Sequence, residues 1–265
     1  SPNCILKFLT LSLKISISGI FAFIILSIGC FFYYHLLTSY KDKDNVTDFR
    51  NEANAFYSQG YEGFGWGHTN NEGYINILDY VPGMDIKVLI MGSSHMEARQ
   101  VMQKNSTTSL LNSRYGLNTY NIGLDSYPFV SCASNLKAAV KKYRPSECIV
   151  IETGSVNITK KNAVDIIYNR VPKKQRLAYN KELLSMLGRV WYLRLLYRQY
   201  VVPFRQFFTH FPQNTHTSET PVSPELLSEM LRTMNNAVSI SGAKLIIAYH
   251  PSISLNKDGT LKIND

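Results

Sequence analysis

The sequence predicts an α/β fold with a parallel sheet, preceded by one transmembrane helix. Two observations predict it. Short apolar segments that end at a glycine alternate with longer helix-like segments, which is the pattern of β-α-β units. The N-terminal stretch from Ile15 to Leu37 contains no Asp, Glu, Lys or Arg, which is typical of a helix that crosses a bilayer. Strands joined through such crossovers run parallel, so a parallel sheet is expected.

The apolar stretch 15–37 is long enough to span a membrane, because about 20 residues at 1.5 Å each cross a hydrocarbon core of roughly 30 Å. A cleaved signal peptide is the alternative, but no A-x-A-like site follows the stretch. Lys7 and Lys14 precede it, whereas the charges of Lys41–Asp44 balance one another. Residues 1–40 are therefore expected to form a single-pass anchor with a cytoplasmic N-terminus and an extracytoplasmic domain.

The composition is that of a folded protein. Of the 265 residues, 45% are hydrophobic and 18% are charged, which excludes an intrinsically disordered chain. The formal net charge of +9 comes without zinc-finger spacing or a dense Lys/Arg block, so no nucleic-acid partner is expected. The basic balance is compatible with an anionic lipid surface or an acidic cell-wall polymer.

The four cysteines do not form a disulfide scaffold. Cys4 and Cys30 lie in or beside the apolar stretch. Cys132 opens an expected helix and Cys148 enters the following strand, so the two should lie farther apart than the roughly 7 Å that separates bridged Cα atoms. Free, mostly buried thiols are expected. No His or Cys spacing predicts a metal site, and no metal or cofactor is expected.

The domain is expected to span residues 87–265. Residues 41–86 are polar, aromatic and marked by glycines, and they are expected to form a linker. The segment 165–221 is rich in Leu, Tyr and Arg and is expected to be a helical insertion, either packed on the domain or forming a basic lid. The other expected elements are, in order, strand 87–91, strand 118–122, helix 131–144, strand 148–152, a helix from 223 to about 242 and strand 244–249.

Small or polar turns follow three of the four expected strands. They read GSSH at 92–95, NIGLDS at 121–126 and TGSVN at 153–157. In parallel α/β sheets the ligand site lies outside the carboxyl ends of the strands, so these turns should meet at one edge. A serine in the first turn can present its hydroxyl there, beside backbone N–H groups that face a developing oxyanion.

These turns resemble the sequence blocks of the SGNH (GDSL-like) hydrolase superfamily. Ser94 occupies the position of the nucleophile, with Ser93 where that family often has Asp. Gly123 matches the glycine that donates its N–H to the oxyanion, and Asn157 matches the asparagine donor of a Gly-x-Asn-Asp block, displaced by one residue. The resemblance covers about residues 87–249. It implies a three-layer α/β/α sandwich close to the flavodoxin-like arrangement.

The GSSH variant resembles that of SGNH-like proteins of cell-envelope polysaccharide and teichoic-acid modification. This implies a membrane-anchored serine hydrolase or O-acyltransferase that acts on acyl, above all acetyl, esters of an envelope glycan or teichoic-acid-like polymer. A membrane acyltransferase is a possible partner. The alternatives from other classes are a non-catalytic membrane-anchored partner of a polysaccharide-modification assembly and a structural anchor that uses the fold as a scaffold.

The family's last block, Asp-x-x-His, carries the general base, and no such block occurs before Asp265. Either the C-terminal part of the domain is missing from the chain, or the protein is a relative that lacks the usual base. Each site residue also has a structural interpretation: Ser94 as a helix cap, Gly123 as a tight strand exit and Asn157 as a turn residue. His250 is expected to be structural or to line the cleft.

Overall fold

The computed structural model describes residues 2–35, 37, 39–60, 63–154, 158–168 and 222–250, together with the short strands 252–255 and 261–264. Two of the expectations therefore lie outside the described residues. One is the position of Asn157, and the other is the insertion from residue 169 to 221.

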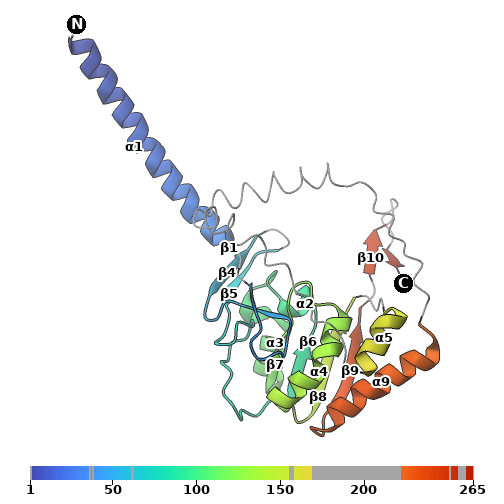
Figure 1. The fold of residues 1–265 in the computed structure, drawn as a ribbon. Coiled ribbons are helices and arrows are strands. Elements are labelled where there is room, and N and C mark those ends of the chain that lie inside the picture. The colour runs from blue at the N-terminus through green and yellow to red at the C-terminus, as the bar shows by residue number, and fades with distance from the viewer. Residues whose placement is uncertain are drawn as a thin grey trace.

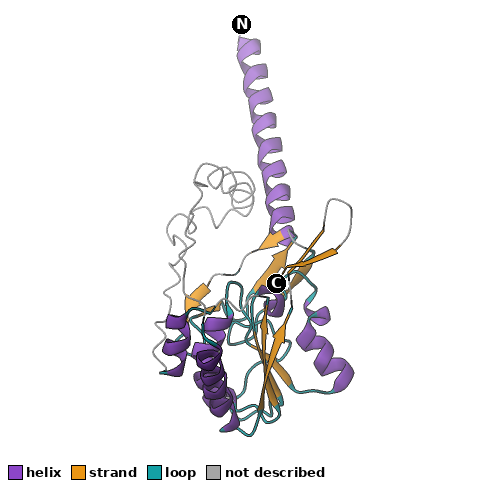
Figure 2. Ribbon diagram, turned by 90° about the vertical axis from the view of Figure 1, so that its right-hand side faces the viewer, coloured by secondary structure: helices purple, strands orange, loops and turns teal. Residues whose placement is uncertain are grey.

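The N-terminal helix α1 (Pro2–Tyr33) projects from the domain as one straight rod in both views of the molecule (Figures 1 and 2). Its 32 residues extend for about 48 Å at 1.5 Å each. Leu, Ile and Phe side chains are exposed along its length from Phe8 onward. Within the described part of the chain, Lys7–Tyr33 is the one helical segment long and apolar enough to cross a membrane, a test that a signal sequence also passes.

Residues 34–68 build two small antiparallel sheets at the C-terminal end of α1. One sheet has the strand order β1-β4-β5 and the other pairs β2 with β3. Side chains join the first sheet to the helix, because the Ser58 hydroxyl donates to the carbonyl oxygen of Phe31 and Tyr33 donates to that of Gly60. The strands are β1 (Tyr34–His35), β2 (Ser39–Lys41), β3 (Phe49–Asn51), β4 (Phe56–Gln59) and β5 (Gly65–His68).

The segment 41–86, expected to be a linker, is instead part of the folded domain. Val46, Phe49 and Tyr74 are buried in the main hydrophobic core, and Phe49 packs edge-on against Tyr127 with ring centroids 6.4 Å apart. The strands of this segment are three or four residues long, too short to show an alternating pattern. Its fold comes from burial against the rest of the domain rather than from local propensity.

Glu72 anchors this segment to the parallel sheet and its helices. Its carboxylate accepts hydrogen bonds from the hydroxyls of Tyr120 (3.0 Å) and Tyr143 (2.8 Å). It also forms ion pairs with Lys142 and Arg50, whose side chains are each 18% exposed. These partners offset the cost of burying the carboxylate, because two hydroxyls donate to one of its oxygens and two cations pair with the other.

The main sheet has four parallel strands in the order β7-β6-β8-β9. The sequence predicts the parallel sheet, and the structure adds the order of its strands. The central strand β6 is buried at all four positions and lies between Tyr120 of one neighbour and Ile149 of the other at Leu89. A strand covered on both faces explains its unbroken apolar sequence. The strands are β6 (Val88–Met91), β7 (Thr119–Asn121), β8 (Cys148–Thr153) and β9 (Lys244–Tyr249).

Helices connect these strands and pack on the sheet (Figure 1). Helix α3 contacts β7, and helices α4, α5 and α9 contact one another. The start of α9 is as predicted, since the Ser223 hydroxyl accepts the N–H of Leu226 and Pro224 is the first helical residue. The helices are α2 (Ser94–Glu97), α3 (Thr107–Tyr115), α4 (Phe129–Tyr143), α5 (Lys160–Ile167) and α9 (Pro224–Ser239), with a 3-10 turn at Gln103–Asn105.

Two features complete the described chain. Cys30, Cys132 and Cys148 are free, as expected, but of these three only Cys132 is buried, whereas Cys30 and Cys148 are partly exposed. After β9, the strands β10 (Ser252–Leu255) and β11 (Leu261–Asn264) pair antiparallel.

If residues 41–86 belong to the core, truncating one of their buried side chains must destabilise the whole domain. We expect Phe49→Ala to lower the free energy of unfolding by about 3 to 5 kcal/mol, measured by urea denaturation of the detergent-solubilised protein. Phe64→Ala is the matched control, because Phe64 is 56% exposed, and it should change stability by less than about 0.5 kcal/mol. Equal effects of the two substitutions would show that the segment is not part of the core.

Candidate functional site

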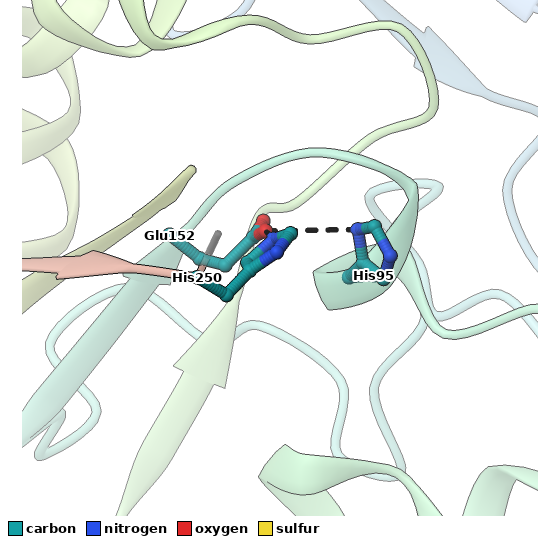
Figure 3. Close-up of side chains that lie close together, drawn as sticks. All are labelled: His95, Glu152 and His250. Atoms are coloured by element: carbon teal, nitrogen blue, oxygen red, sulfur yellow. Dashed lines mark hydrogen bonds and ion pairs between the residues drawn. The ribbon is translucent and has the colours of Figure 1, made fainter. Parts of the chain in front are cut away.

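The candidate site lies at the carboxyl edge of the main sheet, where β6, β8 and β9 end (Figure 3). Strand β6 passes through Gly92 and Ser93 into the short helix α2, which begins at Ser94. Strand β8 contributes Glu152, and His250 directly follows β9. The parallel arrangement therefore brings three chain segments that are far apart in sequence to one edge.

Ser93 holds the carboxylate of Glu152. Its backbone N–H donates to Glu152 Oε2 at 3.0 Å, and its hydroxyl donates to the same oxygen at 3.1 Å. Ser93 is the N-cap residue of α2, yet its side chain makes no capping hydrogen bond to the helix. The Ser93 hydroxyl therefore orients the Glu152 carboxylate and does not cap α2.

Ser94 is the first residue of α2, not its cap. Its side chain is partly buried at the sheet edge. Among the described residues no hydrogen bond of its hydroxyl is found, whereas the neighbouring Ser93 hydroxyl is bonded to Glu152. The structural interpretation of Ser94 as a helix cap therefore does not describe this turn, and its oxygen is available to a ligand.

Two imidazoles face the other oxygen of Glu152. His250 Nε2 is hydrogen-bonded to Glu152 Oε1, and His95 Nδ1 lies 3.7 Å from the same atom. The rings of His95 and His250 lie side by side with centroids 4.6 Å apart, at an angle of 68° (Figure 3). The Glu152 side chain is 5% exposed, against 66% for His95 and 41% for His250. The cluster thus consists of a buried carboxylate and two solvent-accessible imidazoles that contact or approach the same carboxylate oxygen.

Two glycines make room for this cluster. A Cβ on Gly92 would lie 2.6 Å from Glu152 Oε2, and a Cβ on Gly154 would lie 2.6 Å from His250 Cε1. Neither glycine has a positive φ, so close approach of the neighbouring side chain, rather than backbone conformation, requires them. The glycines that end the expected strands are part of the construction of the site.

Gly123 lies against α2, where an added Cβ would meet Met96 Cβ at 2.7 Å. Its N–H donates to Asn121 Oδ1 at 2.8 Å, so this amide is engaged within the protein. The Asn121 side chain in turn donates to the carbonyl oxygen of Met96 at 2.6 Å, which ties β7 to α2. Gly123 therefore lies near the serine turn, as expected. Its backbone N–H is hydrogen-bonded to the side chain of Asn121.

A buried ion pair fixes α2 in place. Glu97, which is 1% exposed, accepts a hydrogen bond from Arg99 Nη2 at 2.6 Å and one from Asn51 Nδ2 at 2.8 Å. Its other oxygen accepts the backbone N–H of Asp125 at 2.9 Å. The carboxylate thereby connects the helix that carries Ser94 to β3 and to the loop after β7.

Cys132 is a buried thiol that lies within the electrostatic influence of Glu152. Its burial and, second, the negative charge of Glu152 raise the pKa of the thiol well above the usual range. The thiol is therefore neutral at physiological pH and does not supply a thiolate nucleophile.

An open hollow of about 430 Å³ begins at His95 and runs along the far side of α2. That volume falls in the range of small-molecule sites. Its lining combines polar and apolar surface. The lining residues are His95, Ala98, Gln100, Val101, Asn105 and Thr107.

No protein-family model, curated protein or solved structure matches this chain. The function must therefore be argued from the site.

The sequence placed Ser94 at the edge of the sheet. It did not reveal Glu152 or the approach of His95 and His250 to its carboxylate. Glu152 closes an apolar strand sequence, CIVIET, and a charged residue in a buried strand is the signal that could have found it. His95, Glu152 and His250 do not form a recognisable sequence motif, because they come from three segments far apart in the chain.

Removing the charge of Glu97 should destabilise the protein, because the largely buried Arg99 would lose its carboxylate partner and keep only neutral acceptors such as Asn51 Oδ1. We expect Glu97→Gln to lower the free energy of unfolding by about 3 kcal/mol, measured by urea denaturation. Glu147→Gln is the matched control: Glu147 is 53% exposed, pairs with Lys87 at 3.5 Å and should change stability by less than about 1 kcal/mol. A Glu97→Gln protein as stable as the control would show that the ion pair does not hold α2.

Proposed function

We propose that the protein is a membrane-anchored serine hydrolase or O-acyltransferase of the SGNH type, with Ser94 as its nucleophile. The observation that carries the proposal is the position of Ser94: its hydroxyl lies at the carboxyl edge of a parallel sheet, without a hydrogen bond among the described residues, one residue from Ser93. Ser93 is bonded to Glu152, and Glu152 is bonded to His250. Serine catalysis needs a nucleophile within reach of an imidazole–carboxylate pair, and Ser94 stands in the chain between Ser93 and His95, which both approach Glu152.

In this proposal His250 is the general base. Its Nε2–H donates to Glu152 Oε1, which leaves the lone pair of Nδ1 to accept the proton of the Ser94 hydroxyl. Glu152 stabilises the imidazolium that forms, as the acid of a catalytic triad does. This assignment supplies the base that the Asp-x-x-His block provides in the resembled family, from an imidazole that the sequence pattern alone does not single out.

The reaction then proceeds through an acyl-serine. Ser94 Oγ attacks the ester carbonyl as its proton passes to His250, and the carbonyl oxygen becomes an oxyanion. When the C–O bond to the alcohol breaks, His250 returns the proton to the leaving oxygen. Water or an acceptor hydroxyl, deprotonated by the same imidazole, attacks the acyl-serine and restores the Ser94 hydroxyl. Water gives hydrolysis and a sugar hydroxyl gives transfer.

The resemblance assigns the oxyanion donors to Gly123 and Asn157. For Gly123 this requires its N–H to leave Asn121 Oδ1 and turn toward the substrate, which a rotation of the Asn121 side chain would allow. The proposal also takes the fold to be the three-layer sandwich of that family. Part of the support is the parallel sheet of four strands, which the family shares.

The proposed substrate is an acyl, above all acetyl, ester of an envelope polysaccharide or a teichoic-acid-like polymer. The open hollow beside His95 offers polar side chains such as Gln100 and Asn105 to a glycan. The apolar helix α1 would hold the domain at the surface of the bilayer, on its extracytoplasmic side. A membrane acyltransferase that delivers the acyl group would be the partner of a transfer reaction.

A fluorophosphonate probe tests the nucleophile. The full-length protein in detergent micelles should be labelled, and Ser94→Ala should lose at least about 99% of the label because no other activated hydroxyl is proposed. Ser134→Ala is the matched control, since that hydroxyl donates only to the carbonyl oxygen of Ser131 in its own helix, and it should be labelled normally. Labelling that persists in Ser94→Ala, or a folded protein that is never labelled, would contradict the proposal and favour a non-catalytic partner.

A methyl group on Gly154 tests the base. We expect Gly154→Ala to displace the His250 ring, because the new Cβ would lie 2.6 Å from Cε1, and to slow fluorophosphonate labelling at least about tenfold. Gly29→Ala is the control, since a Cβ there meets nothing within 4 Å. Circular dichroism of both variants should match the unmodified protein. An undiminished labelling rate in folded Gly154→Ala would remove His250 from the mechanism.

A further inference from the structure

We propose that His95, Glu152 and His250 form a binding site for a divalent transition metal, of which Zn²⁺ is the representative. The metal would take His95 Nδ1, Glu152 Oε1 and His250 Nε2 as ligands. The three ligand atoms lie within 4.8 Å of one another, and they come from α2, β8 and the residue after β9. Metal binding itself does not depend on the proposed function, whereas its effect on Ser94 rests on it.

The distances suit a small ion. With bonds of 2.0 to 2.2 Å in a tetrahedral site, neighbouring ligand atoms lie about 3.4 Å apart. His95 Nδ1 is 3.7 Å from Glu152 Oε1, and His250 Nε2 is in hydrogen-bond contact with the same oxygen. Both rings approach the same carboxylate oxygen, so side-chain rotations that move His250 Nε2 away from Oε1 would open the space for the ion.

The ligand set is one that zinc prefers. Two imidazoles and one carboxylate, with a fourth position left to water, make up several zinc sites with an open coordination position. The Glu152 oxygen that does not face the imidazoles is fixed by the N–H and the hydroxyl of Ser93, which turns Oε1 toward His95 and His250. Hydrogen bonds of this kind to the outer atoms of a ligand fix its orientation and raise metal affinity.

The charge of Glu152 also calls for a cation. Its side chain is 5% exposed, and within the described chain neither Lys nor Arg forms an ion pair with it. A buried carboxylate without a permanent positive partner is costly to keep ionised. A divalent ion shared with two neutral imidazoles would neutralise it, and the exposed edges of both rings leave a path for the ion to enter.

Under the proposed function the metal would act as an inhibitor. A metal on His250 Nε2 replaces the proton there, so the neutral imidazole carries its remaining proton on Nδ1 and has no lone pair left to accept one from Ser94. His95 is a ligand without a part in the proposed chemistry. The site would therefore make the activity sensitive to free zinc through a residue that catalysis does not use.

Cobalt binding tests the site directly. The chelator-treated full-length protein in detergent should bind one Co²⁺ per chain and develop visible d–d absorption bands of a site with nitrogen and oxygen ligands. His95→Ala should weaken binding at least about tenfold, because loss of a ligand costs no less than loss of an outer hydrogen-bond partner. His68→Ala is the matched control, since His68 is exposed on β5 away from the cluster. Absence of the bands, or equal binding by the two variants, would overturn the proposal.

Fluorophosphonate labelling separates this proposal from the previous one. Stoichiometric Zn²⁺ should slow labelling of the unmodified protein at least about tenfold and EDTA should restore it, whereas zinc should not change the labelling rate of His95→Ala from the rate that this variant shows without metal. Zinc-insensitive labelling of a protein that binds cobalt would overturn the inhibitory role alone. A protein that binds cobalt but is never labelled would leave the metal site standing and overturn Ser94 as nucleophile.

Discussion

The arrangement of the site depends on one buried carboxylate. Glu152 lies at the end of β8 with 5% of its side chain exposed, and each of its oxygens has partners from a different strand exit. Oε2 is held by Ser93 after β6, and Oε1 faces His250 after β9 and His95 in α2. A charge at this depth is tolerated only with hydrogen-bonded partners, so Glu152 fixes the positions of the residues around it.

The surrounding structure holds those strand exits in register. Glu97 ties α2 to β3 and to the loop after β7, and Glu72 ties the segment 41–86 to the sheet and α4. Both are carboxylates whose oxygens are shared among several donors. The β1-β4-β5 sheet is joined to α1 by the hydrogen bonds that Ser58 and Tyr33 donate. The apolar helix therefore leads directly into the domain that carries the site.

Much of the fold could be predicted because its signals are local. The apolar sequence of β6 reports a strand buried on both faces, and Ser223-Pro224 reports the start of a helix. Residues 41–86 carry no such signal. Their strands are too short for periodicity, and side chains such as Phe49 and Tyr74 become buried only when the rest of the domain covers them. For the same reason Glu152 and His250 could not be paired in advance.

By itself the sequence determined an apolar N-terminal helix, a parallel α/β sheet and the presence of Ser94 in a turn at the carboxyl edge of that sheet. These follow from hydrophobic period, strand length and turn residues, which act between near neighbours in the chain. Only the tertiary structure decided that Glu152 and His250, separated by 97 intervening residues, share a hydrogen bond, and that His95 faces the same oxygen. Such contacts are set by the order of strands in the sheet, and no local property of the chain encodes that order.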